Sequence, residues 1–279
     1  MQTCCADPMA KRSPWPAMGR ASPPLGLITF LHNQVIGVPS SLATGSGLAT
    51  GTVVTSGRSP ARAEWSAELM AALLVALPVF LQAPWVRLAP FSAALFTAPL
   101  LAAGILLTNR RPGGWSAAGS LLVGFCGSWL GGCLFWGWCR LHPLLHLPIE
   151  AFALPLALGG LRGRWRLAAS FYLASLLGTA CTDGVMAITG VMRSWTLVLE
   201  APIAEAAPLL QQAALGVLAP LPLAVVSGAA LVLMVLCRRG WDHPDPAWRL
   251  AAAALATTLA VDGLFLAAAL WAPQLSGLI

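Results

Sequence analysis

The stretch at residues 116–138, S-A-A-G-S-L-L-V-G-F-C-G-S-W-L-G-G-C-L-F-W-G-W, contains no charged side chain. As a helix it would be about 35 Å long, which is enough to cross the roughly 30 Å hydrocarbon core of a bilayer. The whole chain has a similar composition, since 58% of its 279 residues are hydrophobic and only 9% are charged. A soluble domain carries about 25% charged residues. The sequence therefore predicts a membrane protein.

Six further apolar runs of similar length follow or precede this stretch. The predicted spanning helices cover residues 66–83, 91–108, 116–138, 144–161, 167–190, 216–237 and 249–271. Tryptophans lie at or just beyond many of the predicted ends, as is typical of aromatic anchors at a membrane interface. We therefore predict an all-α fold, a polytopic transmembrane helical bundle of about seven spans.

The basic residues predict the orientation of this bundle. If the N-terminus is cytoplasmic, the outer segments contain only Arg87, Arg140 and Arg193, and the other 13 of the 16 Lys and Arg residues lie inside. Inner loops of membrane proteins carry an excess of Lys and Arg. Adding or removing one span would move every later loop to the other side of the membrane and would remove this asymmetry. We therefore expect the N-terminus in the cytoplasm and the C-terminus outside.

Two segments differ in composition from the apolar spans. Residues 1–63 are rich in Ser, Pro, Gly and Thr and contain five basic residues, which predicts a disordered tail. A start codon assigned too far upstream is the alternative, because Met70 stands near the head of the first apolar run. Residues 64–279 form the predicted transmembrane domain. Within it, residues 193–215 contain glutamates, prolines and glutamines, and we expect an interfacial or re-entrant segment there.

Three carboxylates lie at membrane depth, away from the ends of the predicted spans: Glu150, Asp183 and Asp262. An ionised carboxylate at the centre of a spanning helix costs about 2.5–3.5 kcal/mol, so each needs a partner, water or a proton. Counted from the helix ends, Glu150 and Asp183 both lie roughly 10 Å below the outer edge. Asp262 is nearer the middle of the bilayer, on the same side. We predict one polar layer in the outer half of the membrane.

Two histidines precede Glu150 in the stretch H-P-L-L-H-L-P-I-E. His142, His146 and Glu150 are spaced four residues apart, which places them on one face of a continuous helix. Pro148 removes one helical hydrogen bond and can leave His142 in the preceding loop, so His146 and Glu150 are the firmer pair.

Four interpretations of this polar group remain open. His146 can hold the fourth and fifth helices in register, or belong to a proton or cation pathway. It can also ligate a metal or haem, or serve an acid and base pair in an enzyme. No nucleophile or oxyanion motif accompanies it, which favours a non-enzymatic role. We expect no cofactor and no resident metal.

The third span carries small residues at helical spacing. Gly127 and Gly131 form a small-x-x-x-small pair that lets a neighbouring backbone approach closely, so we predict a helix-packing role. In the alternative interpretation, Trp129, Trp136 and Trp138 line a groove for a pigment, a quinone or a lipid.

The net charge of +6 does not point to nucleic acid, because the basic residues occupy short gaps between apolar runs. Their expected partner is the lipid bilayer. Arg87, at the outer end of the first span, is expected either to extend into the interface or to offer its charge to the polar layer or an anionic head group.

Three stretches carry a resemblance to a known family: P-V-F-L-Q-A-P-W-V-R at 78–87, W-G-W-C-R-L-H-P-L-L-H-L-P-I-E-A at 136–151 and F-Y-L-A-S-L-L-G-T-A-C-T-D at 171–183. Over residues 66–220 the chain resembles cyanobacterial integral membrane proteins that are catalogued as a domain of unknown function. The resemblance implies a photosynthetic host and a plasma or thylakoid membrane. It implies no activity.

Two functional hypotheses follow. The first is proton- or cation-coupled transport of a small solute through an outer-facing cavity lined by His146, Glu150, Asp183 and Asp262. The second is an assembly or biogenesis factor for a photosynthetic membrane complex, whose partner helices or pigment contact the third span.

Overall fold

The computed structural model describes residues 61–110 and 114–275. Within these residues every regular element is a helix, and seven helical segments are long and apolar enough to cross a membrane. These spans are Ala67–Leu88, Pro90–Arg110, Trp115–Cys139, Pro143–Gly160, Arg166–Thr189, Pro220–Trp241 and Pro246–Trp271. The predicted all-α bundle of about seven spans is therefore confirmed. The predicted tail lies outside the described residues, apart from residues 61–63, which begin the first helix.

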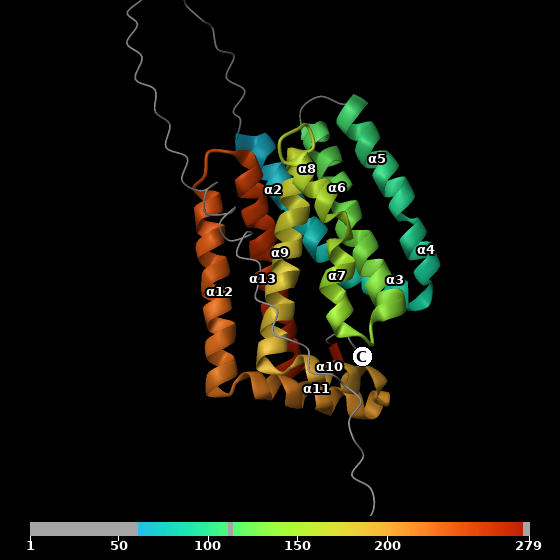
Figure 1. Ribbon diagram of the computed structural model, residues 1–279, viewed down its shortest axis with the longest axis vertical. Coiled ribbons are helices and arrows are strands. Elements are labelled where there is room, and N and C mark those ends of the chain that lie inside the picture. Colours follow the sequence, from blue (N-terminus) through green and yellow to red (C-terminus); the bar gives the residue numbers. More distant parts are fainter. Residues whose placement is uncertain (1–60, 111–113, 276–279) are drawn as a thin grey trace, which may run out of the picture. The chain divides into compact units, whose positions relative to one another are not determined.

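Figure 1 labels the α-helices, and the short η elements lie between them or after them in the chain. In chain order the elements are α2 (Ala61–Leu77), η1 (Pro78–Gln82), α3 (Ala83–Leu88), α4 (Pro90–Leu95), α5 (Thr97–Arg110), α6 (Gly114–Leu134), η2 (Phe135–Cys139), η3 (Pro143–Leu145), α7 (His146–Glu150), η4 (Ala151–Ala153), α8 (Leu154–Gly160), α9 (Arg166–Thr189), α10 (Met192–Glu200), α11 (Ile203–Val217), α12 (Pro220–Trp241), α13 (Pro246–Trp271) and η5 (Pro273–Leu275).

Helix α6, the uncharged stretch quoted above, is at the centre of the bundle. In the span that contains α6, 67% of the most apolar 18-residue stretch is buried inside the protein, against 6–28% of the corresponding stretch in the other six spans. The core contains Leu74 of α2, Phe125 of α6, Phe171 of α9 and Leu250 of α13. Glycines allow the close packing, because a Cβ on Gly124 would lie 2.4 Å from a backbone oxygen of α9. The apolar, glycine-rich sequence of α6 thus explains its enclosed position.

The first span is longer than predicted. It was expected to end at residue 83, but it continues through η1 and α3 to Leu88. Element η1 is a π-helical turn that begins at Pro78. Pro84, next to the predicted end, stands in the first turn of α3, where a missing N–H is tolerated, so the span continues past it.

The fourth span is not the continuous helix that was predicted. It consists of four short pieces, η3, α7, η4 and α8. Pro143, Pro148 and Pro155 lie in it, and each lacks the N–H that a helix interior needs. The backbone of His142 is non-helical, with φ −118° and ψ 75°, so His142 precedes the helical pieces, as the prolines allowed, and only His146 and Glu150 of the three lie on one helix.

Helices α10 and α11 follow the fifth span, and α11 lies across one end of the bundle (Figure 1). Helix α9 ends at Gly190, whose φ of +78° is the left-handed conformation that glycine adopts readily at a helix C-terminus. These two helices cover the segment that was expected to be interfacial or re-entrant.

Ion pairs lie at the opposite end of the bundle. Arg249 Nε is 3.4 Å from Glu68 Oε1, and Arg166 pairs with Asp245. Arg166 and Arg249, which belong to two of the segments predicted to be cytoplasmic, therefore both form ion pairs there. The direction of the bundle across the membrane stays a prediction.

Candidate functional site

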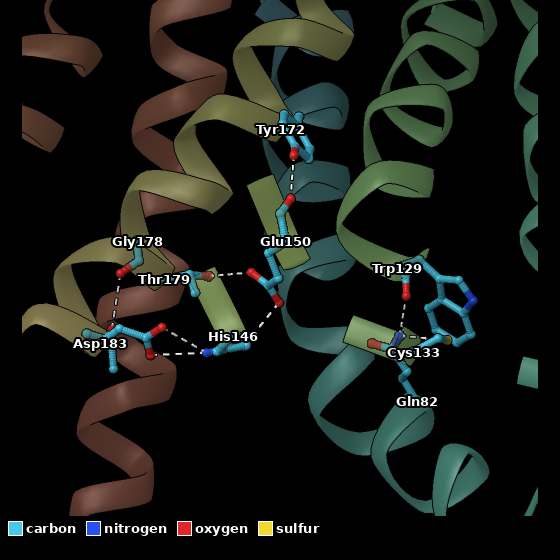
Figure 2. A network of polar contacts seen from close by, with 10 residues as sticks. Gln82, Trp129, Cys133, His146, Glu150, Tyr172, Gly178, Thr179 and Asp183 are labelled. Carbon is cyan, nitrogen blue, oxygen red and sulfur yellow. Dashed lines mark hydrogen bonds and ion pairs between the residues drawn. The ribbon is translucent and has the colours of Figure 1, made fainter. Parts of the chain in front are cut away.

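His146 lies between two carboxylates that come from different helices (Figure 2). Its Nδ1 atom is 3.0 and 3.1 Å from the two carboxylate oxygens of Asp183 on α9. Its Nε2 atom is 3.3 Å from Oε1 of Glu150, one turn further along α7. The side chains are 19%, 14% and 15% exposed for His146, Asp183 and Glu150. We call these three residues the histidine–carboxylate cluster.

The number of hydrogens in this cluster follows from its contacts. Nδ1 forms a hydrogen bond with Asp183 and Nε2 forms an ion pair with Glu150, so attraction on both sides of the ring requires one hydrogen at each contact. Either the imidazole carries both hydrogens, or it carries one and a carboxyl group carries the other. Both arrangements have the same net charge, one negative charge. A hydrogen can therefore move between imidazole and carboxylate without changing the charge of the cluster.

Neighbouring side chains hold Glu150 and His146 in place. The Thr179 hydroxyl donates to Oε2 of Glu150 at 2.9 Å, and the Tyr172 hydroxyl donates to the Glu150 carbonyl oxygen. The fully buried Phe135 ring lies 4.3 Å from the His146 ring, centroid to centroid. The cluster is thus held by α6–η2, α7 and α9 together.

Asp262 of α13 lies beside the cluster and connects to it through α9. Its Oδ2 atom is 2.6 Å from the hydroxyl of Thr182, the residue before Asp183. The same hydroxyl is 3.2 Å from the carbonyl oxygen of Gly178. A hydroxyl has one hydrogen, so Thr182 donates to one of these two oxygens at a time. His146 therefore contacts Asp183 of α9 directly, whereas Asp262 is linked to α9 through Thr182, the residue before Asp183.

A small pocket opens onto the cluster. Its volume is about 10 Å³, and it is lined by Phe135, Pro143, His146, Asp183, Met186, Met192 and Trp195. This is close to the smallest space that holds one water molecule. Glu150 and Asp262 do not line it. Of the four polar residues predicted to share a cavity, His146 and Asp183 line this pocket.

The other two predicted polar residues lie elsewhere. His142 and Arg87 both line a second pocket, of about 230 Å³, between the end of α3 and η2. Neither is among the residues that line the pocket at His146. His142 lies outside the cluster because the helical pieces of the fourth span begin only at Pro143.

The glycines of α6 face helices of the same chain. A Cβ on Gly127 would lie 2.8 Å from two ring carbons of Tyr172, and one on Gly131 would lie 3.0 Å from Cα of Glu150. The two glycines therefore let α7 and α9 approach α6 at the level of the cluster. This geometry is the one that helix packing requires, and it leaves no room there for a partner helix.

The three tryptophans of this span do not share a groove. Trp129 is buried and donates from Nε1 to the Ala93 carbonyl oxygen at 2.9 Å. Trp136 packs against Trp195 with ring centroids 5.4 Å apart, and Trp138 is 46% exposed. The groove interpretation therefore does not hold for Trp129, although Trp136 and Trp138 both line the larger pocket.

Metal ligation finds no support in the described part of the chain, where no group of three His, Cys, Asp or Glu side chains is arranged to hold a metal ion. The physical reason at the cluster is that both ring nitrogens of His146 already face carboxylates. A metal ligand needs a nitrogen with a free lone pair.

Several polar residues of this region were not predicted. Thr179 lies one helical turn before Asp183, so the same spacing that relates His146 to Glu150 relates these two residues on α9. That spacing was a usable signal. Gln82 is only 4% exposed, and its Nε2 donates to the Trp129 carbonyl oxygen at 2.5 Å and lies 3.0 Å from Cys133 Sγ. It links the first span to α6.

Seven apolar spans define an integral membrane protein of the all-α, polytopic class. The chain belongs to the family described as "Protein of unknown function (DUF3120)", whose model matches residues 71–270. The match covers every residue of the cluster and confirms the family resemblance. No curated protein and no solved structure matches the chain.

Proposed function

We propose that the protein is a proton- or cation-coupled transporter of a small solute, and that the histidine–carboxylate cluster holds the coupling ion. The observation that carries this proposal is one imidazole bridging two carboxylates from different helical segments inside the spans. Asp183 lies six residues before the end of α9, or about 9 Å along the helix. Ionisable groups at such depth are rare and commonly mark ion and proton pathways.

The charge of the cluster supports this role. With two hydrogens it has one net negative charge, which a bound proton or a monovalent cation neutralises. A net charge at this depth carries a free-energy cost, and ion binding removes it. Ion binding therefore lowers the free energy of a conformation in which the cluster is closed off from water. That difference is what a coupled carrier needs to link ion binding to a conformational change.

The broken fourth span supports the same proposal. His146 and Glu150 lie on a five-residue helix between two 3-10 turns, η3 and η4. Discontinuous spanning helices commonly build the ion sites of transporters, because their ends can shift without unwinding a long helix. The cluster therefore joins a fragmented element, α7, to a continuous one, α9.

The second hypothesis, an assembly or biogenesis factor for a photosynthetic membrane complex, has less support. It relied on α6 contacting partner helices or pigment, and α6 is the most enclosed of the described spans. Such a factor would have to use another surface. A plasma or thylakoid location in a photosynthetic host stays an expectation of the family resemblance.

The proposal is tested with purified protein in liposomes that contain a pH-sensitive dye. A potassium gradient with valinomycin makes the lumen negative, and a panel of small solutes is added outside. We expect solute-dependent acidification with the wild type, and at least a tenfold slower rate with Asp183→Asn and with Glu150→Gln. Each of these variants removes one charge from the cluster and keeps its size.

The matched control is Glu205→Gln, which makes the same chemical change at an exposed position in the first turn of α11. It should leave the rate unchanged. Equal acidification rates in the wild type, Asp183→Asn and Glu150→Gln would contradict the proposal.

A further inference from the structure

The larger pocket, of about 230 Å³, lies between the first and third spans. Val86 and Arg87 of α3 and Pro90 of α4 form one side, and η2 with the following turn forms the other. A Cβ on Gly137 would lie 3.1 Å from Cβ of Pro90, so glycine at this position lets η2 approach the start of α4. The pocket is therefore built by two segments that are far apart in the sequence.

The lining of this pocket is basic. Arg87 and Arg140 reach it from the two sides, His142 adds an imidazole, and none of the described residues lining it is acidic. The guanidinium group presents a planar fork of donors that matches a carboxylate or a phosphate in two parallel hydrogen bonds. Two arginines that line one pocket from separate segments are suited to a compact anion.

The remaining lining is apolar. Trp136 and Trp138 contribute indole rings, and Pro90 contributes a ring of its own. The volume of about 230 Å³ is many times the roughly 10–15 Å³ that one water molecule needs. A carboxylate or phosphate group with several attached carbon atoms fits this space. Its charged group would face the arginines and its carbon atoms the aromatic rings.

We propose that this pocket binds an amphiphilic anion through a carboxylate or phosphate group held by Arg87 and Arg140. The ligand is either a free organic anion or the head group of an anionic lipid, which share this chemistry. The pocket adjoins the histidine–carboxylate cluster through one aromatic pair: Trp136 lines the anion pocket, and Trp195, packed on it, lines the pocket at His146. Trp195 also donates to the Arg140 carbonyl oxygen at 2.8 Å. The anion site does not depend on the transport function.

Two binding experiments without transport test the proposal and distinguish the two sources. Detergent-solubilised protein is titrated with inorganic phosphate and with succinate, against chloride at equal ionic strength, while tryptophan fluorescence is recorded. Native mass spectrometry then compares retention of phosphatidylglycerol with that of phosphatidylcholine. Saturable binding of phosphate or succinate supports the free anion, and selective retention of phosphatidylglycerol supports the lipid head group.

The variants are Arg87→Gln and Arg140→Gln, with Arg193→Gln as the matched control, because Arg193 is exposed on α10 and does not line the pocket. We expect each pocket variant to weaken binding at least tenfold and the control to leave it unchanged. Arg140→Lys, which keeps the charge and loses the fork, should weaken binding less than Arg140→Gln. The proposal is overturned if neither experiment detects binding above its control, or if both pocket variants bind as tightly as the wild type.

Discussion

The contact between α6 and α9 allows a quantitative prediction for Gly124→Ala. The added Cβ would lie 2.4 Å from the Ala168 carbonyl oxygen and 2.9 Å from its Cα atom. A carbon in contact with a carbonyl oxygen normally lies about 3.3–3.6 Å from it, so the two helices must separate by about 1 Å. Both obstructing atoms belong to the backbone of α9, so no side-chain rotation relieves the clash.

The cost of that separation is near the upper end for overpacking, about 3 kcal/mol. Alanine recovers up to about 1 kcal/mol relative to glycine within a helix. We therefore expect Gly124→Ala to lower the free energy of unfolding by about 2 kcal/mol. The assay is reversible unfolding in mixed micelles of increasing denaturing-detergent content, followed by circular dichroism.

Gly228→Ala on α12 is the control for this prediction, because nothing lies within 4 Å of its added Cβ. It should leave the stability unchanged or raise it by up to about 1 kcal/mol. If Gly124→Ala is as stable as Gly228→Ala, the close packing of α6 against α9 is refuted.

Two further predictions use the same materials. Arg166→Gln should lower the free energy of unfolding by less than about 1 kcal/mol, because the arginine in its pair with Asp245 is 48% exposed and the pair is screened by solvent; a loss above 2 kcal/mol in the unfolding assay would show otherwise. Gly131→Ala places a methyl group 3.0 Å from Cα and 3.3 Å from Cγ of Glu150, and this should displace the carboxylate of Glu150. We therefore expect slower coupled acidification in the liposome assay. An unchanged rate would refute this link between helix packing and the cluster.

The spans could be predicted because the membrane requires long apolar helices whatever their tertiary contacts. The errors occurred where proline intervenes. The first span was expected to end at residue 83, directly before Pro84, and Pro148 was expected to disturb only the first turn of a helix that is in fact four pieces. Local backbone geometry at proline depends on which neighbouring groups donate hydrogen bonds to the unpaired carbonyl oxygens, and that is a tertiary property.

The meeting of His146, Glu150 and Asp183 was partly predictable. Helical spacing related the first two, and equal depth brought Asp183 to the same level. Depth does not give the rotation of α9 about its axis, so the direct contact between Asp183 and His146 required the structure. The role of Thr179 was missed for the same reason, although its position one turn before Asp183 was visible in the sequence.

The bridging position of His146 is the central claim, and nitrogen-15 NMR of histidine-labelled protein in lipid bilayers tests it most directly. The chain has four histidines, so the His146 signals are identified by their loss in His146→Gln. We predict that both ring nitrogens are hydrogen-bonded, that the Nδ1 signal shifts in Asp183→Asn, and that the Nε2 signal shifts in Glu150→Gln. A His146 ring nitrogen without a hydrogen bond, or signals unchanged by both variants, would contradict the account.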